Sequence, residues 1–350
     1  MPQLNLDCEG PLTLNDNAFE LCEAFIPNGD KFFALISKYD DFLADVEKRS
    51  GYKAGDTLKL ILPFLKAYDV TNDLMREFSK KTLKVLPEAL PFLRFAKDTW
   101  PTFIISTSYR PYLEALSEVS GFPMENIFCT WVDLEQVKLL PEEKKLLQKL
   151  AQEIANLPMI EIPHEAQGLT DLPPESQKVI LKLDEIFWKI IPETNAGYFL
   201  NEVNPIGGTE KAKAVKKSLS VTGLSLEEIL YIGDSITDVQ VFELVKEKGG
   251  AVSFNGNRYA LRAAEFYALA PQAAFHSCLG IIFSEGGREA LVQQASQKNF
   301  KICHKLPKSL KDWAKDFEFG LINQEDFEAL VSKSESFRKN VRGEAVGALG

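Results

Sequence analysis

The sequence predicts an α/β fold, a doubly wound parallel sheet with helical cap insertions. Three observations predict it: short apolar runs alternate with long helical stretches, several of these runs end in carboxylate or hydroxyl residues, and two helical segments interrupt the alternation. In a sheet of this kind, ligands bind outside the carboxyl ends of the strands. We therefore expect any active site to lie at that edge of the sheet.

Composition indicates an ordinary globular protein. Of the 350 residues, 45% are hydrophobic and 26% are charged, which is typical of a chain with a sizeable core. The formal net charge of −10 argues against a nucleic-acid partner. The cysteines form no CxxC pair, and no run of about 18 apolar residues suggests a membrane span. We expect a cytoplasmic protein without membrane insertion.

Six short apolar runs are the expected core strands. Each is rich in β-branched or aromatic residues and is bounded by a polar residue or a glycine. They lie at 3–7, 101–107, 126–132, 228–234, 250–255 and, more weakly, 267–271. The core is expected to combine residues 1–14, 88–135 and 201–275.

Segments with helical periodicity lie between and after these strands. Residues 15–87 are expected to form a helical cap and residues 136–200 a second helical insertion, both over the active end of the sheet. Residues 276–350 are expected to form a helical C-terminal extension, whose small and polar end RGEAVGALG is expected to be flexible.

Carboxylates at two strand ends predict a site for a divalent cation. The first strand continues as DCEG, and the period of two in an extended chain puts Asp7 and Glu9 on the same side. The stretch LYIGDSITD puts Asp234 and Asp238 at a strand end and in the turn beyond it, with Gly233 allowing a sharp turn. If the two strands are neighbours, these groups repel one another, and Mg²⁺ relieves that repulsion.

Two further stretches supply groups that suit an anionic ligand. The strand FIIST ends in Ser106 and Thr107, whose hydroxyls are alternatives for one hydrogen-bonding role. In PIGGTEKAKAVKK, Lys211 lies where a helix opens, and Lys213 is the alternative to it. A lysine placed near the carboxylates suits the stabilisation of a phosphoryl group.

These stretches resemble, in order, the four motifs of the haloacid dehalogenase-like (HAD) superfamily of aspartate-nucleophile phosphatases. The matching stretches are DCEG at 7–10, FIISTS at 103–108, Lys211 in GGTEKAKAV, and GDSITD at 233–238. The resemblance covers residues 3–135 and 205–272 and implies a HAD-like Rossmannoid core. The stretch AVSFNGNRYALRAAEF is similar to the phosphoserine phosphatase branch. The chain also resembles an archaeal and bacterial family labelled energy-converting hydrogenase A subunit R.

The resemblance implies catalytic roles for the motif residues. Asp7 would attack phosphorus, and Glu9 would protonate the leaving oxygen and then activate water. Ser106, with Thr107 as the alternative, would hydrogen-bond the phosphoryl group. Lys211 would neutralise its charge.

The resemblance also implies metal and substrate contacts. Asp234 and Asp238 would hold Mg²⁺ together with the carboxylate of Asp7 and the backbone carbonyl of Glu9. Asn255 ends a strand at the same edge of the sheet, where the resemblance implies a contact either with the substrate or with a residue that itself contacts the substrate.

The resulting expectation is a Mg²⁺-dependent phosphatase that acts through an aspartyl-phosphate on a small cytoplasmic phosphomonoester, with the caps choosing the substrate. A non-catalytic or regulatory subunit that binds a protein partner is an alternative, because Glu9 replaces the aspartate of the family's commoner DxD motif. A phosphotransferase that passes the phosphoryl group to an alcohol is another. For the oligomeric state, a homodimer is one alternative.

Overall fold

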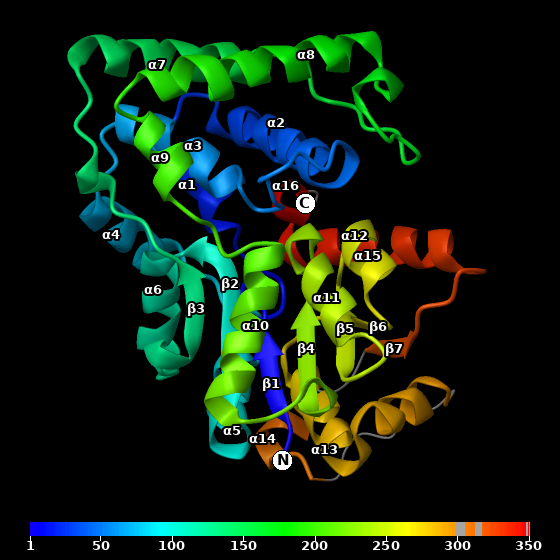
Figure 1. The fold of residues 1–350 in the computed structure, drawn as a ribbon. Helices are drawn as coiled ribbons and strands as arrows, with labels where there is room; N and C mark the ends of the chain where they lie inside the picture. Colours follow the sequence, from blue (N-terminus) through cyan, green and yellow to red (C-terminus); the bar gives the residue numbers. More distant parts are fainter. Residues whose placement is uncertain (298–304, 312–316, 348, 350) are drawn as a thin grey trace.

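The computed structural model describes residues 1–297, 305–311, 317–347 and 349 (Figure 1). Its centre is a seven-stranded sheet in the order β3-β2-β1-β4-β5-β6-β7. The strands are β1 (Gln3–Leu6), β2 (Thr102–Tyr109), β3 (Ile127–Thr130), β4 (Ile229–Gly233), β5 (Gly250–Phe254), β6 (Phe266–Leu269) and β7 (Glu318–Leu321). Neighbouring strands from β3 to β6 are parallel, and β7 is antiparallel to β6. The predicted α/β class and parallel sheet are confirmed.

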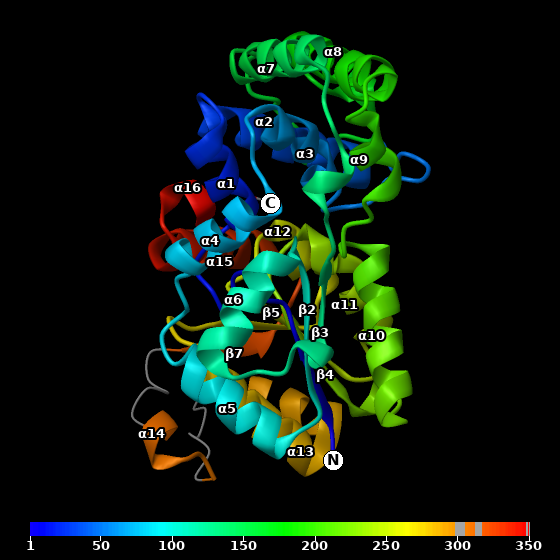
Figure 2. The same cartoon turned by 90° about the vertical axis from the view of Figure 1, so that its left-hand side faces the viewer.

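Helices cover both faces of this sheet (Figures 1 and 2). One face packs against α5 (Ala89–Thr99), α6 (Arg110–Ser120) and α13 (Ala274–Ala295). The other packs against α10 (Thr209–Thr222), α11 (Val239–Val245) and α12 (Arg258–Ala263). Alternation along β4 explains both layers, because Leu230 and Ile232 join the first and Ile229 and Tyr231 the second.

The position of β1 decides where the site lies. It is paired with β2 on one side and β4 on the other, and Leu6 lies opposite both Ile104 and Ile232. The residues that follow these three strands therefore meet at one edge. The chain order reverses at β1, and such a switch point is where open α/β sheets bind their ligands.

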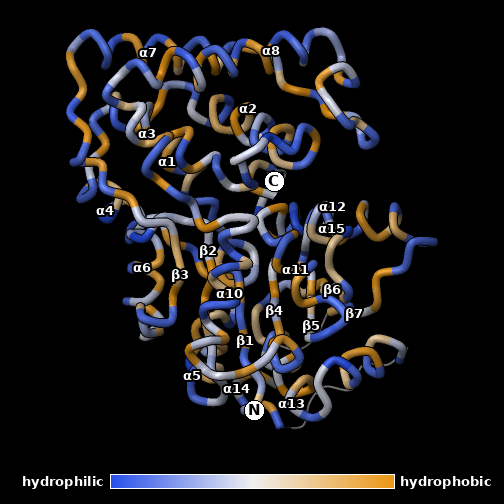
Figure 3. The backbone as a smooth tube through the Cα atoms, viewed as in Figure 1, coloured by the Kyte–Doolittle hydropathy of each residue, from blue (hydrophilic) through white to orange (hydrophobic). Residues whose placement is uncertain are grey.

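Two helical insertions lie over this edge (Figure 1). The first contains α1 (Asn17–Phe25), α2 (Gly29–Asp41), α3 (Thr57–Ala67) and α4 (Asn72–Thr82). The second contains α7 (Pro141–Ala155), α8 (Pro174–Glu185) and α9 (Gly197–Glu202). Hydrophobic positions recur along α7 and α8 (Figure 3), and both insertions contribute to one hydrophobic core.

Aromatic contacts join the two insertions into one helical body. The ring of Phe187, which follows α8, lies 5.8 Å from that of Tyr39 on α2 and 6.0 Å from that of Phe64 on α3, measured between centroids. Arg49 also pairs with Asp184 across the two insertions, at 2.8 Å. The cap over the sheet is thus built from two separate stretches of chain.

The longest helix on the sheet, α13, is apolar at its start and is broken by non-helical backbone at Gly286 and Gly287. Its first part packs under the sheet through Phe275, Cys278 and Leu279. No helix in the described part of the chain is both long and apolar enough to cross a bilayer.

The C-terminal region corrects the expectation that residues 276–350 are only helical. After α14 (Lys308–Lys311), β7 joins the sheet beside β6. A strand of four residues, three of them partly exposed, has too little alternation to be recognised in the sequence. The helices α15 (Phe327–Arg342) and α16 (Glu344–Gly347) then return to the space between sheet and cap (Figure 1).

The expected tail RGEAVGALG is helical in part, and its flexibility stays a prediction. It begins with Arg342, whose side chain is only 5% exposed, and continues as α16. Residues 348 and 350 of the expected tail lie outside the described residues.

Phe187→Ala should destabilise the cap, because it removes a fully buried ring that joins the two insertions. Substitutions of this kind cost about 3–5 kcal/mol of the free energy of unfolding. Urea unfolding followed by circular dichroism measures the change. Leu181→Ala on α8, where the side chain is 56% exposed, is the control and should cost less than about 0.5 kcal/mol. Equal costs for the two variants would show that the insertions do not depend on this contact.

Candidate active site

A buried charge network forms where β1, β4 and α10 meet. Asp7 follows β1, and its Oδ2 accepts a hydrogen bond from Nζ of Lys211 at 2.5 Å. Lys211 also donates to Oδ1 of Asp238 at 2.7 Å and is fully buried. Lys213 is exposed and pairs with Glu210. Of the two lysines considered from the sequence, Lys211 is therefore the one that reaches the carboxylates.

Asp238 organises the loop that follows β4. Its Oδ1 accepts from Lys211 and, at 2.6 Å, from the hydroxyl of Tyr231. Its Oδ2 accepts from the backbone N–H groups of Asp234 and Ser235, at 2.9 and 3.0 Å. Both oxygens of this carboxylate are thus engaged by donors of the protein itself.

Two glycines allow carboxylates to approach the backbone. Gly10 has a φ of +100°, and a Cβ there would overlap the carboxylate of Asp234. A Cβ at Gly233 would overlap the carboxylate of Asp238. Gly233 does not have a positive φ, so it is required for this close approach and not for the sharp turn that we expected.

Three carboxylates lie close enough together to hold one cation. One oxygen each from Asp7, Asp234 and Asp238 lies within 4.8 Å of the others, and carboxylate oxygens are the ligands that Mg²⁺ prefers. All three carboxylates accept hydrogen bonds from the protein, and Asp7 accepts them on both oxygens, from Lys211 and from the N–H of Cys8. Asp238 accepts the most, from four donors, so Asp7 and Asp234 are the proposed side-chain ligands and the contact with Asp238 stays a prediction. Glu9 is not part of this cluster in the described residues, so its predicted metal contact depends on its backbone carbonyl alone. The residues present fit a hard divalent cation.

Burial makes the proton equilibrium of Asp7 unusual. It raises the pKa of Asp7 to about 7, although Lys211 opposes the rise; the charges of Asp238 and Asp234 add to it. A carboxyl group that titrates near neutral pH is sensitive to any added positive charge. A bound cation would therefore favour the ionised form of Asp7.

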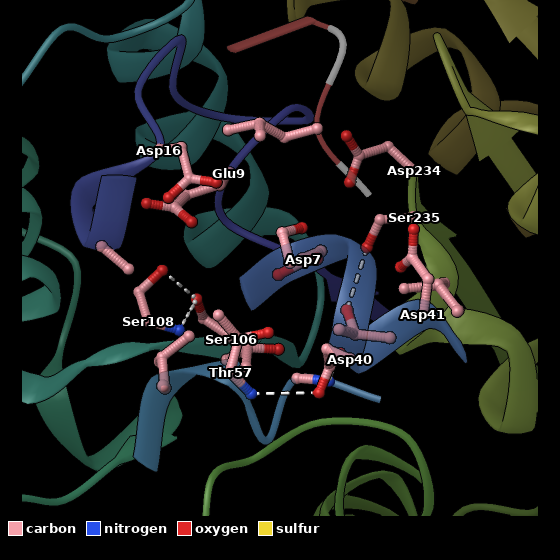
Figure 4. A pocket seen from close by; sticks show the side chains of 18 of the residues that line it. Asp7, Glu9, Asp16, Asp40, Asp41, Thr57, Ser106, Ser108, Asp234 and Ser235 are labelled. Carbon is pink, nitrogen blue, oxygen red and sulfur yellow. Dashed lines mark hydrogen bonds between the residues drawn. The ribbon is translucent and has the colours of Figure 1, made fainter. Parts of the chain in front are cut away.

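Glu9 lies on the cap side of Asp7, and its side chain faces Asp16 (Figure 4). Its Oε1 accepts a hydrogen bond from the backbone N–H of Asn17 at 2.7 Å. Burial raises the pKa of Glu9 well above its usual value, and the charge of Asp16 adds to the rise. A raised pKa favours the protonated carboxyl group, which is the form that can donate a proton.

The end of β2 offers the two predicted hydroxyls. Ser106 lies in the wall of the same cavity as Asp7, and its Oγ donates to Oγ of Ser108 at 3.1 Å (Figure 4). Thr107 also borders the cavity, but its hydroxyl donates to the carbonyl of Ile206 at 3.0 Å. This engagement favours Ser106 of the two.

The structure corrects the expectation for Asn255. Its Nδ2 donates to the carbonyl of Ala270 at 2.8 Å, and its Oδ1 accepts from the N–H of Ala270 at 3.0 Å. It does not line the cavity that contains Asp7. Its amide instead fixes the end of β5 to the chain after β6. A strand-end position in the sequence did not show which way this side chain points.

A cavity of about 110 Å³ joins five of the predicted residues, whereas Lys211 and Asp238 lie behind its wall and do not line it. Its wall contains Asp7, Glu9, Ser106, Thr107 and Asp234. The cavity is therefore bordered by residues that follow β1 and β4 and by residues of β2, as predicted for a site at one edge of the sheet.

The cap adds acidic groups that the sequence did not single out. Asp16, Asp40 and Asp41 line the cavity (Figure 4). Asp40 accepts from the hydroxyl of Tyr52 at 2.6 Å and from the N–H of Thr57 at 3.0 Å, and burial raises its pKa to about 7. A carboxylate within a helical segment usually indicates a solvated face, so the sequence held no signal for these positions.

Two arginines from the C-terminal helix were also missed. Arg338 and Arg342 of α15 both donate to Oδ2 of Asp234, and both line the cavity. Their spacing of four puts them on one face of a helix, which in the sequence resembles an ordinary exposed basic face. Only the path of the chain through β7 brings this helix to the site.

Residues 135–269 match a family model described as haloacid dehalogenase-like hydrolase. This match spans the second insertion and the part of the core that contains Lys211, Asp234 and Asp238. Over these residues the chain is similar to that family, as the motifs predicted.

The chain is similar to a solved structure, the gene product AF1437 from Archaeoglobus fulgidus, with a TM-score of 0.81 and 28% identity over 100% of this chain and 99% of that chain. A substrate-bound phosphoserine phosphatase complex gives a TM-score of 0.45 and 10% identity, covering 80% of this chain and 97% of that one. A HAD family hydrolase from Salmonella enterica gives a TM-score of 0.42 and 9% identity, covering 73% of this chain and 62% of that one. No curated protein sequence matches significantly. None of these names carries the hydrogenase-subunit label, which stays a prediction.

Mg²⁺ should raise the unfolding temperature more at pH 8 than at pH 6. The pKa of Asp7 is about 7, and the cation binds the ionised form, so the apparent affinity falls by up to about tenfold for each pH unit below 7. At a Mg²⁺ concentration 100 times the Kd, binding adds about 2.7 kcal/mol to the free energy of unfolding. Scanning calorimetry with and without Mg²⁺ at the two pH values measures the difference.

Two variants complete this experiment. Asp234→Asn removes a ligand and should abolish the shift at both pH values. Asp73→Asn, at a side chain that is 86% exposed, should retain it. An equal shift at pH 6 and pH 8, or one that persists in Asp234→Asn, would contradict the assignment of the cation to Asp7 and Asp234.

Proposed function

We propose that the protein is a Mg²⁺-dependent phosphatase that hydrolyses a small phosphomonoester through an aspartyl-phosphate on Asp7. The observation that carries the proposal is the position of Asp7, which is buried at the switch point of the sheet, hydrogen-bonded to Lys211, and in one cavity with Glu9, Ser106 and Asp234. The similarity of residues 135–269 to a family of hydrolases supports the same chemistry.

In the first step, a carboxylate oxygen of Asp7 attacks phosphorus, and the bond from phosphorus to the leaving oxygen breaks. Glu9 transfers its proton to that oxygen, so the alcohol leaves neutral. The raised pKa of Glu9 supports this role, because the carboxyl group holds a proton to give. Lys211 and Ser106 stabilise the charge on the phosphoryl oxygens.

In the second step, the ionised Glu9 takes a proton from water, and the water oxygen attacks the phosphorus of the aspartyl-phosphate. The bond from phosphorus to the oxygen of Asp7 breaks, which releases inorganic phosphate and restores both carboxyl groups. Mg²⁺ held by Asp7, Asp234 and the backbone carbonyl of Glu9 would neutralise negative charge on the phosphoryl group.

The cavity sets the size of the substrate. Its volume of about 110 Å³ suits a phosphoryl group with a small alcohol, so we propose a small cytoplasmic metabolite. The helical cap borders the cavity through Asp40, Asp41 and Thr57, and exclusion of bulk water by the cap would strengthen the electrostatic interactions inside it.

Asp7→Asn should reduce Mg²⁺-dependent hydrolysis of p-nitrophenyl phosphate by at least about a thousandfold, because an amide cannot form the phosphoenzyme. Release of p-nitrophenol measures the rate, and Asp73→Asn is the control with the same chemical change on an exposed side chain. Undiminished hydrolysis by Asp7→Asn would exclude Asp7 as the nucleophile.

A metabolite panel tests the alternatives for the wild-type protein. No turnover across the panel, together with a protein partner that co-purifies, would favour a regulatory subunit. Transfer of the phosphoryl group to added glycerol at the expense of inorganic phosphate would favour a phosphotransferase.

Glu9→Gln should affect substrates according to their leaving groups. Protonation matters most for an alkyl alcohol, so the rate should fall by about 10²- to 10⁴-fold for an alkyl phosphate and less for p-nitrophenyl phosphate. The ratio of the two kcat/KM values is the measurement. An equal loss for both substrates would contradict the acid role of Glu9 in the first step.

A further inference from the structure

The C-terminal helix α15 contacts several loops of the proposed active site. Ser334, Arg338 and Arg342 donate to backbone carbonyls after β5, β4 and β1, respectively. These side chains lie along one face of the helix, at spacings of four. The helix is anchored from its other end by β7, which is part of the sheet. It is thus integral to the wall of the cavity.

The two arginines share one oxygen of a proposed metal ligand. Both donate to Oδ2 of Asp234, and their side chains are only 4% and 5% exposed. Among the described residues, Asp234 is the sole carboxylate in ion-pair distance of either guanidinium group. Nε of Arg338 is buried without a hydrogen-bond partner in the described part of the chain. An unpaired buried donor is costly, which points to a ligand group absent from the protein itself.

The ion-paired groups of the site balance one another without a metal. Ion pairs connect three carboxylates and three cations, namely Asp7, Asp234 and Asp238 with Lys211, Arg338 and Arg342. A divalent cation on Asp7 and Asp234 would therefore give this ion-paired network an excess of two positive charges. A phosphoryl group with two negative charges would balance that excess.

The positively charged side chains of the cavity wall lie on one side of it. In the described residues, Arg338 and Arg342 are the only lysine or arginine side chains that line the cavity. The cap contributes acidic and neutral groups instead, among them Asp40, Asp41 and Thr57. An anionic substrate in this cavity therefore contacts positively charged side chains on the side that α15 forms.

Resting on the proposed phosphatase function, we propose that Arg338 and Arg342 are substrate-binding residues that hold the phosphoryl group in the metal-loaded protein. Guanidinium groups suit this role, because they present several donors in one plane and are weakly hydrated. Metal and substrate then bind cooperatively, since the cation draws Asp234 away from the arginines and frees their donors for the anion.

Inorganic phosphate is the probe, because it is not turned over. Isothermal titration of the full chain with phosphate in saturating Mg²⁺ should give a Kd that rises about 10- to 100-fold in Arg342→Ala, the loss expected for charged hydrogen bonds. The KM for p-nitrophenyl phosphate should rise with it. Arg342→Lys, which keeps the charge, should recover part of the affinity.

Arg258→Ala is the matched control. Arg258 of α12 pairs with Glu328 of α15 but does not line the cavity, so its removal should leave the Kd for phosphate unchanged. Titration with Mg²⁺ alone separates binding from positioning. If Arg342→Ala changes the Kd for Mg²⁺ and not that for phosphate, the arginine only positions Asp234 and the inference is overturned.

A second measurement needs no variant, so it applies even if the arginine variants fail to fold. In the wild-type protein, phosphate with Mg²⁺ should slow amide hydrogen exchange in α15 and α16 relative to Mg²⁺ alone, and no change there would overturn the inference.

The test of the arginines is separate from the test of the phosphatase activity. Hydrolysis by the wild type with an unchanged phosphate Kd in Arg342→Ala refutes the arginine role alone, whereas arginine-dependent phosphate binding without any hydrolysis refutes the phosphatase alone.

Discussion

The burial of like charges at one edge of the sheet is the constraint on which the rest of the site depends. Asp7, Asp234 and Asp238 lie within a few ångströms of one another, and buried carboxylates are costly unless they are paired. Lys211 is fully buried between two of them, and the arginines of α15 meet the third. Gly10 and Gly233 allow this close approach of carboxylates, because a side chain at either position would displace one of them.

Distant stretches of chain combine to enclose this charge. The sheet supplies the carboxylates, two insertions with a shared core supply the roof, and the C-terminal helix supplies two cations. The cap also approaches the core closely, since a Cβ at Gly207, just before α10, would overlap the carbonyl of Ala54 in the first insertion. Such contacts hold the roof near the loop that precedes Lys211, so cap position and site geometry are linked.

The carboxyl groups of the site have different surroundings, which suit them to different roles. Burial raises the pKa values of both Asp7 and Glu9, but only Asp7 has a lysine and an adjacent cation site to restore its ionised form. Glu9 faces Asp16 instead, which favours the protonated state (Figure 4). A nucleophile and an acid follow from these surroundings, as in other sites where two carboxyl groups serve opposite roles. In the same way, four protein donors make Asp238 a support for the loop after β4 and for Lys211.

The sequence by itself determined the α/β class, the strands from β1 to β6, the similarity to the HAD superfamily, and the residues that meet at the edge of the sheet, because strand period and short motifs are local properties. The predicted roles of Asp7, Glu9, Ser106, Lys211 and Asp234 stay proposals. Only the tertiary structure decided that Asn255 bonds to Ala270, that β7 extends the sheet, and that Arg338 and Arg342 reach Asp234. The physical reason is that burial, side-chain direction and the balance of charge arise from contacts between segments far apart in the chain, which no local pattern records.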